Sequence, residues 1–237
     1  MTYLYFALTF FAAGLVPELT GFGVATVTMP ILSLLLPLSV AIPLVAIISM
    51  LVTGFIAYQT RAPGMYGRIT ALVVGTAIGV PLGMFFLEAI DEQTLSMVFG
   101  GFLIVYALYG LFARENKIPT NKTTGTAVGT LAGFFGATFN IHGPLVGLYA
   151  VSEKEASKQQ IKGLIAMYMF ISGVFTVIGH GIADRVTWEV LRYVLFSLPF
   201  LAAGMYVGSR WFTSLKSEWV VTGIYLFVLV AGIIILL

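Results

Sequence analysis

Six apolar segments, each close to the length that a helix needs to cross a lipid bilayer, dominate this sequence. They span roughly residues 39–59, 67–88, 93–113, 158–179, 188–211 and 217–237. A helix crosses the hydrocarbon core in about 20 apolar residues. Apolar residues make up 59% of the 237 residues and charged residues only 9%, which is too little charge for a water-soluble surface. The sequence therefore predicts an all-α polytopic membrane protein.

Composition also excludes several classes of function. The chain has no cysteine and only two histidines, His142 and His180, so we expect no metal site and no cofactor. Its net charge of +2 gives no reason to expect a nucleic-acid partner. No lysine or arginine precedes Arg61, so the apolar N-terminus does not resemble a cleaved signal peptide. We expect a multi-pass protein of the cell (inner) membrane that contacts lipid, and whether it forms a homo-oligomer stays open.

Two further apolar stretches have an awkward length. Residues 2–36 would form a straight helix of about 52 Å and residues 123–152 one of about 45 Å, both longer than a bilayer is thick. The first is interrupted between Pro17 and Gly21, and the second between Gly136 and Pro144. Each stretch is therefore two short crossings, one tilted and broken helix, or a re-entrant hairpin.

The distribution of basic residues favours hairpins. If both stretches are re-entrant, ten of the 12 lysines and arginines share one face, and only Arg185 and Arg192 lie on the other. A single crossing by the second stretch would change the split to seven and five, a weaker cytoplasmic signature. Two full crossings would leave the later spans in the same orientation as a hairpin does. However, a helix over residues 144–152 would reach only about 13 Å, which is too short to cross the bilayer.

Similar patterns recur in the two halves of the chain, residues 1–116 and 117–237. The recurring pairs are Gly79 and Gly83 with Gly204 and Gly208, and Thr53–Gly54 with Ser172–Gly173. Each half holds one interrupted stretch and three full spans, and an odd number of spans predicts two inverted repeats. Chance similarity among glycine-rich helices is the alternative. Glycines at every fourth position, as at Gly75, Gly79 and Gly83, predict close helix contacts.

Glu18 is the acidic residue that lies inside an apolar segment. A buried carboxylate in a membrane costs at least a few kcal/mol, so it must be paired, hydrated or protonated. We expect Glu18 to couple transport to a proton or to gate substrate, unless its carboxyl only caps the helix that follows.

Asn140 and His142 occupy the second interruption, beside Pro144. A proline at the first position of a helix leaves the amides of the next turn free to point at an anion. The imidazole can add a donor or a positive charge. The alternative is a packed histidine that bonds a nearby carbonyl. His180 is expected at the membrane interface, near Asp184.

Hydroxyl side chains complete the expected site. Tyr168, Ser172 and Thr176 are spaced four apart on one span, as are Ser49 and Thr53 on another. Such hydroxyls either line a polar cavity or bond their own helix and hold helices together. The predicted substrate-binding residues are Glu18, Thr20, Gly21, Thr26, Thr28, Thr53, Thr138, Asn140, His142 and Ser172.

The glycine-proline interruptions resemble the TauE/SafE sulfite exporter family. The similarity rests on Gly21 and Gly23 through Pro30 and on Gly133 and Gly136 through Pro144, each followed by a span with a central Thr-Gly or Ser-Gly and then Gly-x3-Gly. It covers nearly the whole chain. The family typically has glycine runs before the proline, where this chain has Ala-Thr-Val-Thr and Asn-Ile-His.

The resemblance implies a transporter of sulfite, thiosulfate or organosulfonate-type anions. Together with the residues above, we expect a secondary transporter that works by alternating access and is not an enzyme. A cation or metal carrier that uses Glu18, Asn140 and His142 is the alternative. An intramembrane enzyme is disfavoured because the buried glutamate and histidine lie in different halves and no serine lies in a recognisable nucleophile motif.

Overall fold

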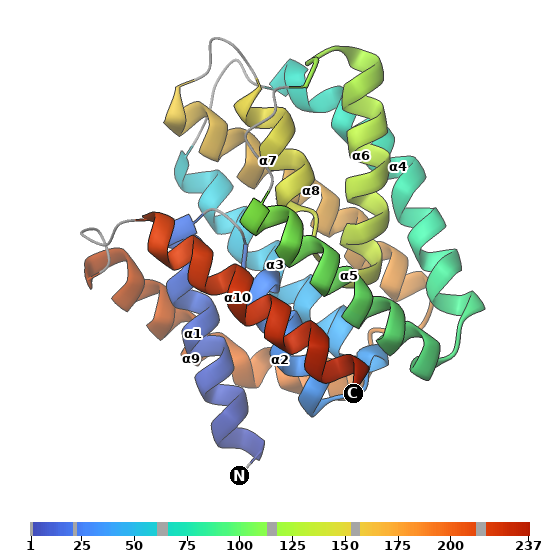
Figure 1. Ribbon diagram of the computed structural model, residues 1–237, viewed down its shortest axis with the longest axis vertical. Helices are drawn as coiled ribbons and strands as arrows, with labels where there is room; N and C mark the ends of the chain where they lie inside the picture. The colour runs from blue at the N-terminus through green and yellow to red at the C-terminus, as the bar shows by residue number, and fades with distance from the viewer. Residues whose placement is uncertain (1, 21–22, 61–65, 113–117, 153–156, 212–216) are drawn as a thin grey trace. The chain divides into compact units, whose positions relative to one another are not determined.

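The computed structural model describes the backbone of residues 2–20, 23–60, 66–112, 118–152, 157–211 and 217–237. Within these ranges the regular elements are ten α-helices (Figure 1). The first half holds α1 (Thr2–Thr20), α2 (Ala25–Leu35), α3 (Leu38–Thr60), α4 (Tyr66–Ala89) and α5 (Glu92–Phe112). The second half holds α6 (Lys122–Phe139), α7 (Gly143–Val151), α8 (Lys158–Ile182), α9 (Trp188–Trp211) and α10 (Ser217–Leu236).

Five described helices are long and apolar enough to cross a membrane: Leu38–Thr60, Ile69–Ala89, Glu92–Phe112, Gln160–Ile182 and Trp188–Gly208. They coincide with five of the six spans expected from the sequence. The sixth expected span is α10, a helix of 20 residues, whose described apolar part, Val221–Leu236, is shorter. Within the described residues the chain is all-helical, and its long apolar helices agree with the prediction of a multi-pass membrane protein.

Both awkward stretches are broken into two helices, as expected. The first break comes later than predicted, because α1 continues through Pro17 as far as Thr20. A proline removes only its own amide donor, which a membrane helix can tolerate. The chain then turns at Gly23, where φ is 80°, a conformation that costs glycine little. The second break spans residues 140–142, and Asn140 takes the left-handed conformation at φ 58°.

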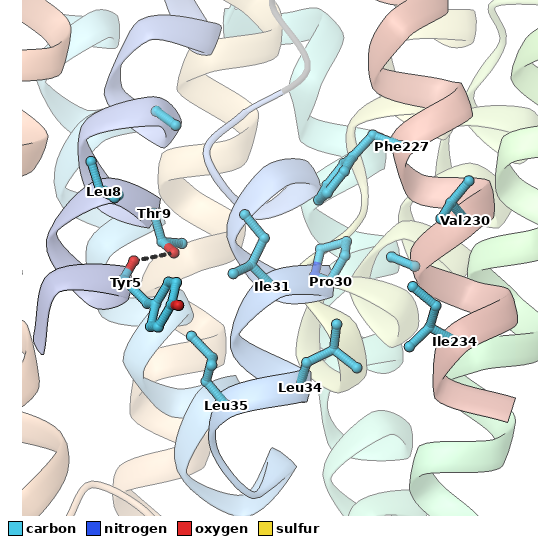
Figure 2. Close-up of a pocket in the computed structure, with 12 residues that line it drawn as sticks. Tyr5, Leu8, Thr9, Pro30, Ile31, Leu34, Leu35, Phe227, Val230 and Ile234 are labelled. Atoms are coloured by element: carbon cyan, nitrogen blue, oxygen red, sulfur yellow. Dashed lines mark hydrogen bonds between the residues drawn. The ribbon is translucent and has the colours of Figure 1, made fainter. Parts of the chain in front are cut away.

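The second stretch returns to its starting point. The amide of Ile118, just before α6, donates a hydrogen bond of 3.0 Å to the Ser152 hydroxyl, just after α7. Tyr149, near the end of α7, also packs beside Gly125 near the start of α6. The two helices form a hairpin, and α7 runs back along α6 in Figure 1. In the first stretch, the start of α1 and the end of α2 line one common cavity (Figure 2).

The helices group into two compact units. Unit 1 comprises Met1–Val45, Ile90–Arg114 and Thr187–Leu237, and unit 2 comprises Ala46–Ala89 and Glu115–Val186. In unit 1, α1 packs along α9 and α5 along α10; in unit 2, α4 packs along α6 and also contacts α8. Each unit combines segments from both expected repeats, and the repeats themselves, 1–116 and 117–237, stay a prediction.

Glycines bring the principal helix pairs into backbone contact. In unit 2, a Cβ added at Gly79 would lie 2.8 Å from the Phe134 amide of α6, and one at Gly75 would lie 2.6 Å from the Thr130 amide. In unit 1, a Cβ at Gly14 of α1 would lie 2.8 Å from the Met205 amide of α9. The close approach expected from the Gly-x3-Gly spacing is confirmed, and it fixes the position of α6 against α4.

Candidate functional site

A cavity of about 440 Å³ opens between α1, α2 and α10 in unit 1 (Figure 2). Its lining is apolar apart from Tyr5 and Thr9, and the Thr9 hydroxyl is already bonded to the Tyr5 carbonyl at 2.7 Å. An anion site needs convergent donors, and this cavity does not supply them. None of the predicted substrate-binding residues that the structure describes lines it.

The break between α6 and α7 gathers buried polar groups in unit 2. Asn140 ends α6: its amide donates to the Gly136 carbonyl at 3.0 Å, and the residue is only 6% exposed. His142 precedes the first residue of α7 and is 7% exposed. Its Nδ1 atom has no hydrogen-bond partner in the described part of the chain. An unpaired buried nitrogen of this kind costs about 1–3 kcal/mol, so it requires a functional or structural explanation.

The position of the His142 ring is set by its neighbours. A Cβ added at Gly136 would lie 2.7 Å from Nδ1, so the ring occupies space that only a glycine leaves. The ring also meets Tyr168 of α8 edge-on, with centroids 6.2 Å apart at 80°. The Tyr168 hydroxyl is held by the Thr76 hydroxyl of α4 at 2.7 Å. Residues of α4, α6 and α8 therefore fix the orientation of the His142 imidazole.

The N-terminus of α7 adds backbone donors to this break. Gly143 and Pro144 are the first two residues of α7, so the proline stands second and not first as expected. The amides of the first turn of a helix have no carbonyl partner within that helix, and they carry a partial positive charge. Proline lacks an amide, which leaves Gly143 and Leu145 to present theirs. A small anion is the ligand that such donors favour.

The predicted polar stripe of α8 is buried in the protein. Ser172 and Thr176 are 0% and 2% exposed, and their hydroxyls have no partner among the described residues. The matching stripe on α3 differs, because Thr53 donates to the Ser49 carbonyl at 2.7 Å while the Ser49 hydroxyl lacks a partner in the region described.

The glycines beside these two stripes lie where α3 and α8 approach each other. A Cβ at Gly54 would lie 2.8 Å from the Phe170 ring, and one at Gly173 would lie 3.0 Å from the Met50 side chain. The Thr-Gly and Ser-Gly pairs that recur in the two halves therefore mark a helix contact within unit 2.

Several predicted threonines bond their own helices, which was the alternative interpretation. Thr28 donates to the Val24 carbonyl at 3.0 Å and Thr138 to the Phe134 carbonyl at 2.9 Å. Thr26 is also buried, at 1% exposed. The hydroxyls of Thr28 and Thr138 reach a substrate only if they leave these carbonyls.

The structure brings together only part of the predicted set. Thr53, Thr138, Asn140, His142 and Ser172 all belong to unit 2, and Thr26 and Thr28 belong to unit 1. The side chains of Glu18 and Thr20, and Gly21 as a whole, lie outside the described residues, so the proton-coupling role of Glu18 stays a prediction. In the part of the chain that is described, no cluster of three or more metal-ligating His, Asp or Glu side chains occurs.

One buried residue was not included in the predicted site. His180 lies in the last turn of α8, and its place at the membrane interface stays a prediction. It is 0% exposed, and neither of its ring nitrogens has a partner in the described ranges. The signal was present, since His180 continues the spacing of four from Tyr168 through Ser172 and Thr176.

Comparison with known proteins identifies the family. Residues 6–235 match the family described as Sulfite exporter TauE/SafE. No curated protein and no solved structure gives a match. The match extends over nearly the whole chain and includes both helix breaks. The chain therefore belongs to the TauE/SafE sulfite exporter family, whose members are integral membrane transporters of sulfite-type anions and not enzymes.

Proposed function

We propose that this protein is a secondary transporter that moves small sulfur-containing anions, of the sulfite, thiosulfate or organosulfonate type, by alternating access. The anion is held at the break between α6 and α7. The observation that carries this proposal is the buried Nδ1 atom of His142, which lacks a partner among the described residues and lies beside the N-terminus of α7.

The chemistry of this break fits a small, singly or doubly charged oxyanion. An anion accepts hydrogen bonds from the amides of Gly143 and Leu145 and from the imidazole, whose Nδ1 atom lacks a partner among the described residues. Hydrogen bonds to a charged group contribute about 1.5–3 kcal/mol each. Because these donors are neutral, they can release the anion again, as a transporter must do.

The hairpin geometry supports a re-entrant placement of this break. The hydrogen bond between Ile118 and Ser152 joins the two ends of the hairpin, so both ends lie at one face of the membrane in our proposal. The break then lies within the bilayer, where interrupted helices form the substrate sites of many transporters. The ten-to-two division of basic residues assigns that face to the cytoplasm.

Export requires little additional energy in this scheme. A membrane potential is worth about 2.3 kcal/mol per charge per 100 mV, so an inside-negative cell expels anions.

Uptake requires a coupling ion, and we assign Glu18 as the proton carrier. Glu18→Gln should abolish the pH dependence of flux in proteoliposomes, and wild-type pH behaviour in this variant would refute the proton role.

Sulfite flux into proteoliposomes tests the site itself. We expect His142→Leu to lower kcat/KM for sulfite about tenfold or more, because a donor to a charged group is lost. Ser197→Ala is the control, since Ser197 is also fully buried but its hydroxyl is bonded to the Val194 carbonyl at 2.8 Å. Unchanged sulfite flux in His142→Leu would overturn the site, and flux of a divalent metal without flux of sulfite would favour the cation carrier.

A further inference from the structure

A row of buried polar side chains lies along α8. Tyr168, Ser172, Thr176 and His180 follow one another at every fourth position, which places them on one ridge of the helix; we call these four residues the α8 ridge. Each is 2% exposed or less. The ridge extends for about 18 Å along the helix, starting at the tyrosine that contacts the His142 ring.

The hydroxyls of this ridge are unusual for a helix. Serine and threonine in membrane helices ordinarily bond the carbonyl one turn earlier, as Thr130 does at 2.9 Å and Ser197 does at 2.8 Å. Ser172 and Thr176 do not, and their hydroxyls have no partner among the described residues; the Tyr168 hydroxyl lies near Ser172 without forming a regular hydrogen bond to it. Both hydroxyls are therefore available to a ligand that passes along the ridge.

His180 lies in the last turn of α8, close to the ends of α4 and α6. The neighbouring Gly179 packs against Met84 of α4, and the backbone of Ala137, in the last turn of α6, lies near the ring without forming a regular hydrogen bond. Arg185 lies next to this histidine, because its backbone amide donates a 2.9 Å hydrogen bond to the His180 carbonyl. Its guanidinium is held by a 2.8 Å hydrogen bond to the Leu87 carbonyl.

Apolar packing alone does not explain Ser172, Thr176 and His180, whose polar side-chain atoms lack a partner among the described residues. Replacing a buried, unpaired polar group with an apolar one of similar size is expected to be neutral or stabilising. A fully buried histidine with two unpaired ring nitrogens is therefore costly for the fold. Buried polar atoms of this kind are the ones for which a functional reason is needed.

We propose that the α8 ridge is a wall of the anion route in unit 2 and that His180 is a second anion-contacting residue at its end. The proposal rests on the function proposed above and extends it by one site. The anion leaves His142 and Tyr168, passes the hydroxyls of Ser172 and Thr176, and accepts a hydrogen bond from the imidazole of His180 within the field of Arg185.

His180→Leu separates this role from a structural one. We expect its melting temperature to equal or exceed that of the wild type, because two unpaired polar atoms are removed. We expect kcat/KM for sulfite in proteoliposomes to fall about tenfold or more. His180→Gln retains an N–H donor and should keep an intermediate flux. Wild-type flux in His180→Leu would overturn the proposal, and so would a parallel loss of melting temperature and flux.

Thr176→Val tests the hydroxyl part of the proposed route independently of the histidine. This change preserves shape and removes only the hydroxyl, and Thr130→Val is its control because that hydroxyl is bonded to its own helix. We expect lower sulfite flux in Thr176→Val alone, and equal flux in the two variants would overturn the proposed route.

If His142→Leu loses flux while the ridge variants keep it, the function proposed above stands and only the second site fails. If the wild-type protein moves no sulfite-type anion, the proposed function itself fails.

Discussion

The contact between α4 and α6 predicts that Gly79→Ala will destabilise the protein. The added Cβ would lie 2.8 Å from the Phe134 amide and closer still to the Thr130 carbonyl. Because an ordinary non-bonded contact needs about 3.5 Å, the two helices would have to separate by about 1 Å along this seam. Overpacking of this kind costs about 1–3 kcal/mol, and both contacts involve backbone atoms, which cannot rotate away. We therefore expect the upper end of that range.

Gly101→Ala is the matched control for this prediction. Gly101 lies within α5, and a Cβ added there meets nothing within 4 Å. Alanine is favoured over glycine inside a helix by about 1 kcal/mol, so this variant should melt at or above the wild-type temperature. The assay heats the detergent-solubilised protein and measures the fraction that remains monodisperse, by size-exclusion chromatography with fluorescence detection. If Gly79→Ala is as stable as Gly101→Ala, the close contact of α4 with α6 is wrong.

Three further predictions concern other parts of the chain. The backbone amide and the hydroxyl of Thr94 donate hydrogen bonds to the Asp91 carboxylate and lower its pKa below the ordinary 3.8. Asp91→Ala should therefore melt at a lower temperature than the wild type at pH 7. This difference in melting temperature should vanish as the pH falls through the lowered pKa. Gly136→Ala should displace the His142 ring and weaken sulfite binding, measured by calorimetry, while a wild-type affinity would argue against this site. Single cysteines at Pro119 and Ser157, in a chain with no native cysteine, should both react with an impermeant maleimide from the same side of the membrane; labelling from opposite sides would exclude the re-entrant hairpin.

The sequence predicts the helices better than it predicts their breaks. Membrane spans follow from apolar length alone, which is why five expected spans coincide with described helices. The first break is harder to place, because Pro17 is compatible with a helix that continues to Thr20. The break at Asn140 was easier, since asparagine and glycine are the residues that adopt a left-handed conformation at low cost.

The candidate site could be predicted only in part. The spacing of Tyr168, Ser172 and Thr176 was visible, but whether a hydroxyl bonds its own helix depends on its rotamer. The structure distinguishes Thr138, which bonds the Phe134 carbonyl, from Thr176, whose hydroxyl has no partner in the described part. The burial of His180 was not predicted, because sequence position near the end of a span does not show that neighbouring helices bury the side chain, which is 0% exposed in the structure.

The most direct test of the central claim uses the two histidines of this chain. Protein labelled with ¹⁵N-histidine in nanodiscs should give ring-nitrogen signals from His142 and His180, which single His→Gln variants assign. We predict that sulfite shifts the Nδ1 signal of His142 in a saturable manner and that a divalent metal at the same concentration shifts it less. If sulfite is transported by this preparation while the His142 signals remain unchanged, the anion does not bind at the break between α6 and α7.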